Sequence, residues 1–346
     1  MKVAMITDTF DGIGGTEQAI KNFTSVLEGL GHQVRIIHSD KRYRIKGPLE
    51  ELLRFNPDIV HVHTPGPLGN LGVLYAKSKE VPVLGYFHSL PDVRFYFERG
   101  LEKKTIGEFL WKLVKYFYQS CDLTLVPTRE VERLLLEKGF ENLRVLHYGI
   151  DLSLFKPVPD GDVRRSLRFG DRDRILLYTG WFRKDKRVDV LLQSLRQLDE
   201  DFKLLLIGDG PTRADLLKEI SSLGISDRVA VHASVENSEL AKFYNCADIY
   251  VNASMSETLG ISMVEAMACG LPVVAAASPG AKDIITPGYN GLLVGLDSPR
   301  SLAEGVEGLW PRRKEMGINA RRATERYDVQ KTTRRLAAIY EETLGF

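Results

Sequence analysis

The sequence is poor in cysteine, with only Cys121, Cys246 and Cys269 among its 346 residues. Three cysteines without metal-ligand spacing argue against a disulfide framework and a zinc site, and they favour a reducing cytoplasm. The sequence also lacks an apolar run of about 18 residues, so we expect no membrane-spanning helix. Its N-terminus meets a charged residue too early for a signal peptide, and we expect a first strand there.

The chain has no excess of charge of one sign, because 47 basic residues face 46 acidic ones and the formal net charge is +1. This balance creates no field that would attract nucleic acid, so we expect no nucleic-acid partner. The hydrophobic fraction of 44% is ordinary for a globular protein. A chain of 346 residues exceeds the size at which single hydrophobic cores stop growing, so we expect two domains.

The first half of the chain alternates strand-like and helical segments. A glycine-rich turn containing Gly14 and Gly15 follows the first strand and precedes a helix with apolar residues at helical spacing. The strand-like segments are residues 2–7, 34–38, 59–63, 83–87, 123–126 and 144–147. This order predicts a mostly parallel, doubly wound α/β sheet of the nucleotide-binding type.

The second half repeats this alternation after a polar stretch that runs to about residue 173. Its strand-like segments are residues 175–179, 202–207, 229–232, 249–251 and a run from 273. The repetition predicts two Rossmann-like domains facing each other across a cleft, over residues 1–155 and 156–326. For residues 327–346 we expect a charged amphipathic helix.

Residues 254–276 are the most informative stretch. They predict a loop, a helix over about 259–269 and then a buried strand, with Gly270 ending the helix. The N-terminus of this helix favours an anion such as a phosphate, because its backbone N–H groups are unpaired and the helix dipole is positive there. Glu257 lies at that end, and Glu265 follows about two turns later.

Two interpretations of these glutamates stay open from the spacing alone. Glu257 could accept hydrogen bonds from neutral hydroxyls beside a phosphate, as on a sugar, and Glu265 could hold a second set such as a ribose diol. Alternatively, Glu257 caps the helix and Glu265 is an ordinary solvated helix residue.

Glu257 and Glu265 are separated by seven residues and are followed by Ala-Met-Ala-Cys-Gly-Leu-Pro-Val-Val. This pattern resembles the Glu-x7-Glu signature of the GT4 family of retaining glycosyltransferases, which have the GT-B fold. The resemblance implies transfer of a hexose from a UDP- or GDP-sugar to an acceptor hydroxyl. It also implies that Glu257 is catalytic and that Thr258, Leu259, Gly260 and Glu265 bind the donor.

Two histidines follow strand-like segments of the first half, His63 in His-Val-His-Thr-Pro and His88 in Gly-Tyr-Phe-His-Ser-Leu-Pro. Ligands of such sheets bind beyond the carboxyl ends of the strands, although a strand-end histidine often only satisfies a local hydrogen bond. His88 matches the histidine of the family's Pro-Val-x-x-x-x-His pattern, which contacts the donor sugar and is needed for activity. On the acceptor side we expect Phe10, Asp11, His63 and Ser89.

The segment Gly-Trp-Phe-Arg-Lys-Asp-Lys-Arg at residues 180–187 resembles the family's Gly-Arg-x-x-x-x-Lys-Gly, whose Arg and Lys grip the donor diphosphate. Lys186 matches the lysine, and the resemblance gives it a catalytic and donor-binding role. Trp181 stands where the arginine is expected. Either Arg183 replaces that arginine, or the phosphates rely on Lys186 and the helix N-terminus near Gly260. A basic, solvated loop is the alternative.

We expect no metal ion or other cofactor, since fixed cations can stabilise the charge of a departing diphosphate. Metal-dependent transferases of the other major fold use an Asp-x-Asp motif at a strand end. The two such motifs here, residues 160–162 and 171–173, precede a strand and are typical of turns. Gly14, Gly15 and Gly208 lie in loops after strands, where they would let the backbone approach the donor.

Two basic stretches with interleaved apolar residues, 41–46 and 106–118, concern the acceptor. They suit an anionic lipid or a membrane face, although the aromatic residues would equally fit a core with solvated lysines around it. The segment after His88 is similar to that of glycolipid-forming relatives. The resemblance therefore implies a sugar, lipid or lipid-linked acceptor and a cytoplasmic protein with peripheral contact to the inner membrane face.

Some features leave alternatives open. The family has Asn-Gly-Val-Asp where this chain has Tyr148-Gly-Ile-Asp, and its C-terminal helix crosses back to the first domain, as we expect for residues 327–346. A sugar-nucleotide epimerase of the same fold would release free sugar without an acceptor. A non-catalytic nucleotide-binding or membrane-adaptor protein is the other alternative, because Trp181 replaces the expected arginine.

Overall fold

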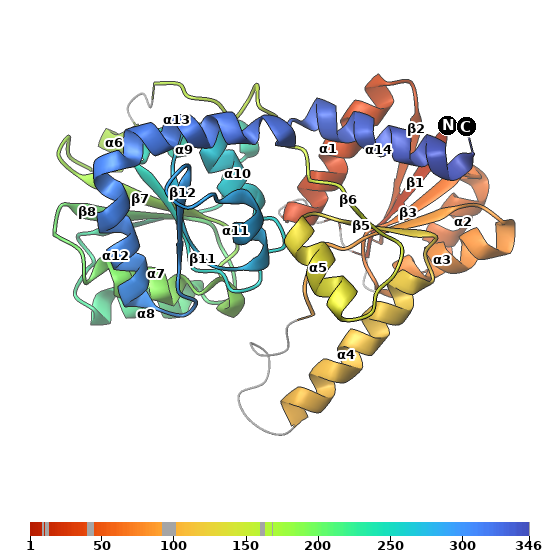
Figure 1. Ribbon diagram of the computed structural model, residues 1–346, viewed down its shortest axis with the longest axis horizontal. Helices are drawn as coiled ribbons and strands as arrows, with labels where there is room; N and C mark the ends of the chain where they lie inside the picture. The colour runs from red at the N-terminus through yellow and green to blue at the C-terminus, as the bar shows by residue number, and fades with distance from the viewer. Residues whose placement is uncertain are drawn as a thin grey trace. The chain divides into compact units, whose positions relative to one another are not determined.

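The computed structural model of the chain describes residues 1–8, 10, 14–39, 45–91, 102–159, 163–167 and 169–345. The chain forms two compact units, which Figure 1 shows. Unit 1 comprises Met1–Gly149 and Tyr327–Phe346, and unit 2 comprises Ile150–Arg326. The first boundary lies before the expected one between residues 155 and 156, and the C-terminal segment belongs to unit 1. Outside the described residues lie Asp11, most of the basic run 41–46 and the Asp-x-Asp segment 160–162.

Unit 1 contains, among its described residues, a six-stranded parallel sheet in the order β2-β1-β3-β4-β5-β6. The strands are β1 (Lys2–Ile6), β2 (Gln33–Ile37), β3 (Ile59–Val62), β4 (Val83–Tyr86), β5 (Leu123–Val126) and β6 (Leu143–Val145). β3 and β4 are buried along their whole length, as expected for parallel strands with helices on both faces. The carboxyl ends of all these strands therefore meet at one edge of the sheet.

The helices of unit 1 include two that begin at a capping side chain. Thr128 caps α5 by accepting a hydrogen bond from the N–H of Val131 at 3.3 Å. Asp328 caps α14 by accepting one from the N–H of Lys331 at 3.1 Å. The helices are α1 (Gly15–Gly29), α2 (Lys46–Phe55), α3 (Pro67–Lys79), α4 (Glu102–Gln119), α5 (Arg129–Glu137) and α14 (Val329–Leu344). α14 packs on α1, and its Tyr340 is fully buried, so the C-terminal helix is part of the core of unit 1.

Unit 2 contains a second six-stranded parallel sheet, in the order β12-β11-β10-β7-β8-β9 over the described residues. The strands are β7 (Arg174–Thr179), β8 (Phe202–Ile207), β9 (Val229–His232), β10 (Ile249–Asn252), β11 (Val273–Ala276) and β12 (Gly291–Val294). The helices are α6 (Val163–Ser166), α7 (Val188–Leu195), α8 (Arg213–Ser222), α9 (Asn237–Cys246), α10 (Ile261–Ala268), α11 (Pro279–Ile284), α12 (Pro299–Leu309) and α13 (Arg313–Ala323). Two 3-10 turns, η2 (Lys184–Lys186) and η3 (Trp310–Arg312), belong to this unit, and a third, η4 (Thr324–Tyr327), lies at its end. The first strand of unit 2, β7, lies in the middle of this sheet. β8 and β9 extend the sheet on one side of β7, and β10, β11 and β12 extend it on the other, which is the Rossmann arrangement.

The two sheets confirm the predicted fold class, and the differences from the predicted elements are local. α10 begins at Ile261, because Gly260 has a left-handed backbone with φ 84° and cannot join the helix. Strand β12 was not predicted, since its Gly-Leu-Leu-Val run is short and shows no alternation.

Candidate functional site

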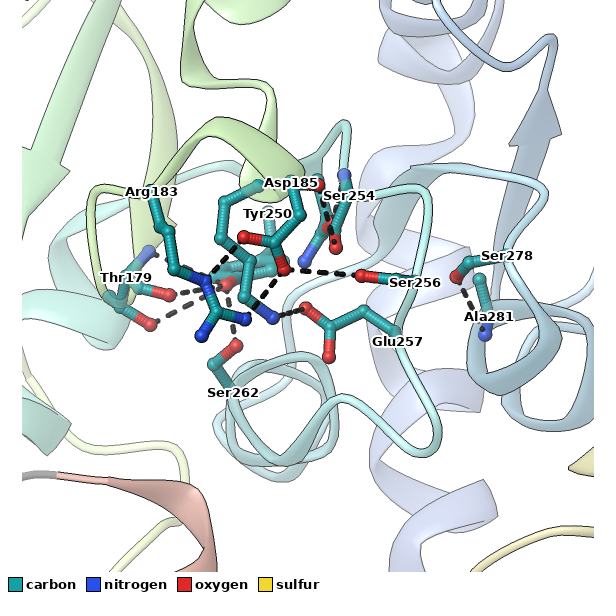
Figure 2. Close-up of polar contacts among 12 residues, drawn as sticks. Thr179, Arg183, Asp185, Tyr250, Ser254, Ser256, Glu257, Ser262, Ser278 and Ala281 are labelled. Atoms are coloured by element: carbon teal, nitrogen blue, oxygen red, sulfur yellow. Dashed lines mark hydrogen bonds and ion pairs between the residues drawn. The ribbon is translucent and has the colours of Figure 1, made fainter. Parts of the chain in front are cut away.

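The loop between β7 and α7 brings two predicted site residues together. Lys186, in the 3-10 turn η2, donates from Nζ to Oε1 of Glu257 across 2.6 Å. Figure 2 labels Glu257, the acceptor of this bond, and its neighbours Asp185 and Ser256. The side chains of Lys186 and Glu257 are only 20% and 15% exposed, so solvent screens this ion pair weakly. An ammonium has three N–H donors and a carboxylate two acceptor oxygens, so each group can bind a ligand while the pair stays formed.

Asp185 fixes this loop to the segment that carries Glu257. Its side chain is 5% exposed and accepts from the hydroxyl of Ser256 at 3.2 Å, while its backbone carbonyl accepts from the N–H of Met255 at 3.3 Å. Burial would raise the pKa of Asp185, but hydrogen bonds from Arg183 and the charge of Lys186 outweigh it and hold that pKa below its usual value. Asp185 is therefore a charged anchor, which the sequence analysis missed.

The capping interpretation of Glu257 is wrong. Gly260 is the N-cap of α10, and no side chain caps this helix in the part of the chain that the structure describes. A Cβ at Gly260 would lie 2.2 Å from Cε of Met263, so this position favours glycine for space as well as for its φ. The N–H of Met263 donates to the carbonyl oxygen of Gly260 at 2.9 Å, so the N–H groups of Ile261 and Ser262 are those that α10 can offer to an anion at the end near Glu257.

Glu265 is buried and not a solvated helix residue, so that interpretation is also wrong. It is 6% exposed, and its Oε2 accepts from the hydroxyl of Tyr244 at 2.8 Å. Burial raises the pKa of Glu265 to about 7, and the bond from Tyr244 only partly opposes this. Tyr244 also shares a 2.8 Å bond with the hydroxyl of Thr179 at the end of β7. No motif in the sequence pointed to Tyr244.

Three cations of the basic loop, Arg183, Lys186 and Arg187, have carboxylate partners, whereas a merely solvated loop would leave them in water. Arg183 forms a fork on Asp185, with Nε to Oδ1 at 2.5 Å and Nη2 to Oδ2 at 2.7 Å. Arg187 has a left-handed backbone, with φ 48°, and binds both Asp189 and Asp297. The fork on Asp185 holds Arg183 in the loop, and its replacement of the expected arginine at Trp181 stays a prediction.

The donor-binding glycines predicted from the sequence lie in tight loops. Gly208 has φ 153°, and a Cβ there would lie 1.9 Å from the carbonyl oxygen of Gly180, so the loops after β7 and β8 touch at this point. Gly14 is the N-cap of α1, and a Cβ would lie 2.1 Å from the carboxylate of Glu17. Gly15 is the first residue of α1.

Thr258 and Leu259 precede Gly260 in the loop before α10. Their side chains are 7% and 0% exposed. Both residues are therefore buried, and the main chain of Leu259 is packed against Gly280 of α11. The carbonyl of Glu257 accepts from the N–H of Gly280 at 2.8 Å, which ties this loop to α11.

In unit 1, His88 follows β4 and is held through both ring nitrogens. Nδ1 lies 2.7 Å from the hydroxyl of Tyr148, and Nε2 lies 2.9 Å from Nδ1 of His63. His88 is 9% exposed and His63 1%, so His63 lies behind His88. The ring of His63 is buried and bonded to His88, and its predicted contact with an acceptor stays a prediction.

The three buried histidines His61, His63 and His88 are neutral at pH 7, because each has a pKa far below 7. Burial, with the neighbouring His61, lowers the pKa of His88 to about 3, and burial lowers that of His61 to about 3. Burial and the two other histidines lower the pKa of His63 well below its usual value. Tyr86, which is fully buried, stacks on His88 with ring centroids 4.7 Å apart.

Of the other predicted acceptor residues, the structure describes Phe10 and Ser89. Phe10 packs beside His38, after the edge strand β2, with ring centroids 5.3 Å apart, whereas exposed Ser89 follows His88. On α4, Phe109, Leu113 and Tyr116 are 58%, 49% and 76% exposed. No described helix is both long and apolar enough to cross a membrane.

A metal site is absent from the described residues, where no three His, Cys, Asp or Glu side chains are grouped to hold an ion. In the Asp-x-Asp segment 171–173, Asp173 accepts from the N–H of Gly170 at 2.7 Å, as a turn residue does.

Comparison with known proteins agrees with this geometry. The family model described as "Glycosyl transferases group 1" matches residues 160–323, and "Glycosyltransferase Family 4" matches residues 41–154. The D-inositol 3-phosphate glycosyltransferase of Thermobispora bispora is 31% identical over 307 residues, which cover 83% of this chain and 71% of that protein. An alpha-monoglucosyldiacylglycerol synthase of Streptococcus pneumoniae is 27% identical, over 85% of this chain and 75% of that protein. The sulfoquinovosyl transferase of Arabidopsis thaliana is 29% identical over 83% of this chain, which spans 57% of that protein's length.

Solved structures match the fold over nearly the whole chain. Sucrose-phosphate synthase from Thermosynechococcus elongatus has a TM-score of 0.88 at 20% identity and covers 99% of both chains. Anabaena HepE has a TM-score of 0.82 at 19% identity, over 99% of this chain and 100% of that one. Two parallel six-stranded sheets, the paired glutamates before and within α10 and these relatives lead to one conclusion: the chain belongs to the GT4 family and is a glycosyltransferase of group 1 with the GT-B fold.

Proposed function

We propose that the protein transfers a hexose from a UDP- or GDP-sugar to a hydroxyl of a lipid or lipid-linked acceptor, with retention of stereochemistry and without a metal ion. The observation that carries this proposal is the Lys186–Glu257 pair beside the N-terminus of α10. It offers a cation and N–H donors for a diphosphate, and a carboxylate for sugar hydroxyls, within one small site.

The charge balance of the reaction explains why such a pair suits it. The bond between the anomeric carbon and the diphosphate oxygen breaks, and a bond to the acceptor oxygen forms on the same face of the sugar. The acceptor proton passes to the departing diphosphate. Negative charge grows on that diphosphate, and Lys186 with the first N–H groups of α10 would stabilise it. Glu257 would accept from the sugar, and the buried Glu265 from the ribose.

His88, a residue of unit 1, would form a hydrogen bond with the donor sugar. Its ring is neutral at pH 7, so it can donate or accept one hydrogen bond without adding charge to the site. We assign Gly14 and Gly15, at the start of α1, to the donor phosphates, where a small residue allows close backbone approach.

The assignment of a lipid acceptor draws on two features. Relatives include a monoglucosyldiacylglycerol synthase and a sulfoquinovosyl transferase, whose names describe glycolipid formation in the first case and sugar transfer in the second. Exposed Phe109, Leu113 and Tyr116 lie three and four residues apart on α4 and so share one face of it, near exposed Lys112. Such a face suits peripheral contact with an anionic membrane surface.

The test is an assay of nucleotide release. Purified protein is incubated with a panel of UDP- and GDP-sugars, each with and without diacylglycerol micelles, D-inositol 3-phosphate or a membrane lipid extract, all in EDTA. We expect release that depends on one acceptor and persists in EDTA. Release without any acceptor, with free sugar as product, would instead identify an epimerase or hydrolase. Binding without turnover across the panel would contradict the proposal.

A matched pair of variants links the activity to the site. Glu257→Gln should lower acceptor-dependent release at least about tenfold, because it removes the charge from a carboxylate that binds hydroxyls. Glu239→Gln is the control, since Glu239 also forms a 2.6 Å ion pair with a lysine of unit 2, Lys242, but on the exposed surface. Equal activities of the two variants would rule out the assignment of Glu257.

A further inference from the structure

Unit 1 contains a buried row of three histidines whose rings contact one another. His61 and His63 are two residues apart and lie on the same side of β3 and its continuation, with ring centroids 4.2 Å apart. His88 follows the neighbouring strand β4, and its ring centroid lies 5.1 Å from that of His63. The three side chains are 0%, 1% and 9% exposed. Burying three imidazoles in one row is costly unless their nitrogens are bonded, so the partner of each nitrogen matters.

His88 uses both ring nitrogens, and this constrains its protonation. A neutral imidazole has one N–H donor and one acceptor nitrogen. Of the two bonds, to Tyr148 at 2.7 Å and to His63 at 2.9 Å, His88 must therefore donate one and accept the other. The partners on both sides decide which nitrogen carries the proton.

The second ring nitrogen of His63 indicates the direction. Nε2 of His63 is buried and has no partner among the described residues. If His88 donated to His63, that Nε2 would be a buried N–H without an acceptor, which is rare in proteins and costs about 1–3 kcal/mol. If His63 donates from Nδ1, its Nε2 keeps only a lone pair. His88 then accepts at Nε2 and donates from Nδ1 to the hydroxyl oxygen of Tyr148.

We propose that His63 is a positioning residue for His88: its Nδ1–H donates to Nε2 of His88 and, with Tyr148 at Nδ1, holds that ring in one tautomer and one orientation. The stack with Tyr148, whose ring plane lies 3° from that of His88, fixes the same orientation. This inference rests on the proposed function, in which His88 contacts the donor sugar. To give a ring nitrogen to the sugar, His88 has to exchange one of these two partners.

His61 provides a control within the same strand. It is also a fully buried histidine, but its Nδ1 lies 2.6 Å from the hydroxyl of Tyr340 on α14. Its Nε2 has no partner among the described residues, so neither ring nitrogen bonds to His88. A purely structural role of buried histidines would make the loss of either ring equivalent, whereas the proposal assigns the effect on His88 to His63 alone.

The experiment records long-range 15N–1H correlations of histidine rings in labelled protein without donor, at pH 7. The variants are His63→Leu, His63→Asn and His61→Leu. The side-chain amide of asparagine can donate from about the place of Nδ1, so His63→Asn is the conservative replacement. In wild type, His61→Leu and His63→Asn we expect His88 in the single form protonated on Nδ1. In His63→Leu we expect an averaged pattern of two tautomers.

Activity with the best donor gives the second readout. His63→Leu should lower kcat about tenfold or more with a smaller change in KM, because a misoriented catalytic group affects the reacting geometry. His63→Asn should recover most of that loss, and His61→Leu should lose much less. If His63→Leu does not fold, His63→Asn and Tyr148→Phe are compared instead. Tyr148→Phe should shift the tautomer of His88, because it removes the acceptor of its Nδ1–H.

Three results would overturn the proposal: an unchanged single tautomer of His88 in His63→Leu, protonation of His88 on Nε2 in wild type, or an equal loss of activity in His61→Leu. Failure of the proposed function is distinguishable from these. One such result is a wild-type protein that transfers no sugar while His88 still shows the expected tautomer and its dependence on His63. That result would contradict the proposed function and support the hydrogen bond from His63 to His88.

Discussion

The polar groups that we assign to the reaction are neutral rings in unit 1 and charges in unit 2. In unit 1, buried His63, His88 and Tyr148 are joined by short bonds between uncharged groups. In unit 2, Lys186 with Glu257 and Arg183 with Asp185 form ion pairs on a loop beside a helix N-terminus. The difference matches the roles that we propose, since uncharged groups suit hydrogen bonds to neutral hydroxyls and cations suit an anionic diphosphate.

The buried histidines of unit 1 and the buried Glu265 of unit 2 respond oppositely to pH. Burial favours the neutral form of every buried titratable group, but the neutral form of histidine is the deprotonated one and that of glutamate the protonated one. Lowering the pH therefore reduces the folding stability of unit 1 through its buried histidines. Raising the pH reduces the folding stability of unit 2 through Glu265. The predictions below challenge this comparison, from the largest expected effect to the smallest.

Removal of the cation in unit 2 should have the largest effect. Lys186→Met should lower kcat/KM about 100-fold, roughly 3 kcal/mol, because one preorganised charge at the departing diphosphate is lost. Lys184→Met is the matched control, since Lys184 lies exposed in the same η2 turn. Steady-state kinetics of both variants give kcat/KM. A similar loss of kcat/KM in both would mean that the net positive charge of the loop matters and not Lys186 in particular.

Replacement of Glu265 should remove the pH response of unit 2. The pKa of Glu265 is about 7 in the folded protein against an ordinary value of 4.5, so folding binds a proton more strongly. The stabilisation is fully present below pH 4.5 and is lost as pH rises through 7. At pH 8, Glu265→Gln should raise the free energy of unfolding by on the order of 3 kcal/mol, and at pH 4.5 it should change it little.

Urea unfolding of unit 2 can be followed by Trp181 and Trp310 in a Trp111→Phe background, since the chain has three tryptophans. The comparison between pH 4.5 and pH 8 is its own control. If Glu265→Gln changes the stability by the same amount at both pH values, Glu265 does not titrate as its burial implies.

Acid should destabilise unit 1. The pKa of His61 and of His88 is about 3 against an ordinary value of 6.5, so the unfolded chain takes up protons below pH 6.5 that the folded chain refuses until about pH 3. Stability is full above pH 6.5 and is lost as pH falls. At pH 5 each histidine should lower the free energy of unfolding by about 2 kcal/mol.

The emission of Trp111, the tryptophan of unit 1, reports this loss in a background where Trp181 and Trp310 are replaced by phenylalanine. His61→Leu should reduce the slope of stability against pH between 5 and 6.5. An unchanged slope would mean that His61 gains a proton in the folded protein at these pH values, against its complete burial.

The smallest effect concerns Arg187, which shapes the basic loop. Its left-handed backbone costs about 1 kcal/mol in a residue other than glycine, and its partly exposed ion pairs with Asp189 and Asp297 contribute a similar amount. Arg187→Gly should therefore change the stability of unit 2 little. Arg187→Ala, which loses the pairs without relieving the backbone, should be less stable than Arg187→Gly by about 1 kcal/mol. Equal stabilities would contradict this balance.

Much of the fold followed from the sequence, because hydrophobic periodicity and glycine positions are local signals. The two alternating halves and the end of α10 before Gly270 are examples. The pairing of Lys186 with Glu257 could not be derived from spacing, since 71 residues separate them and only the folded sheet brings them together. Family resemblance named both residues, but not their contact.

The functional residues that could not be found in the sequence also depend on contacts between distant elements. Tyr148 and Tyr244 act through hydroxyls that reach partners on other elements, and a buried tyrosine looks like any core aromatic in a sequence. Tyr148 nevertheless stands at a departure from the family pattern, shortly after β6, and this position was the one available signal. The burial of Glu265 had a signal in the sequence, because its helix is apolar nearly all round and such a helix is buried rather than solvated on one face.

The central claim is that fixed cations of unit 2, and no metal ion, bind the donor diphosphate. Titration calorimetry in EDTA tests it directly by comparing UDP with UMP, and GDP with GMP, in wild type and in Lys186→Met. For the preferred base, we predict that wild type binds the diphosphate at least about tenfold more tightly than the monophosphate, since charge-assisted hydrogen bonds contribute about 1.5–3 kcal/mol, and that Lys186→Met closes most of this gap. A gap that appears only with added Mg²⁺, or that persists in Lys186→Met, would contradict the account.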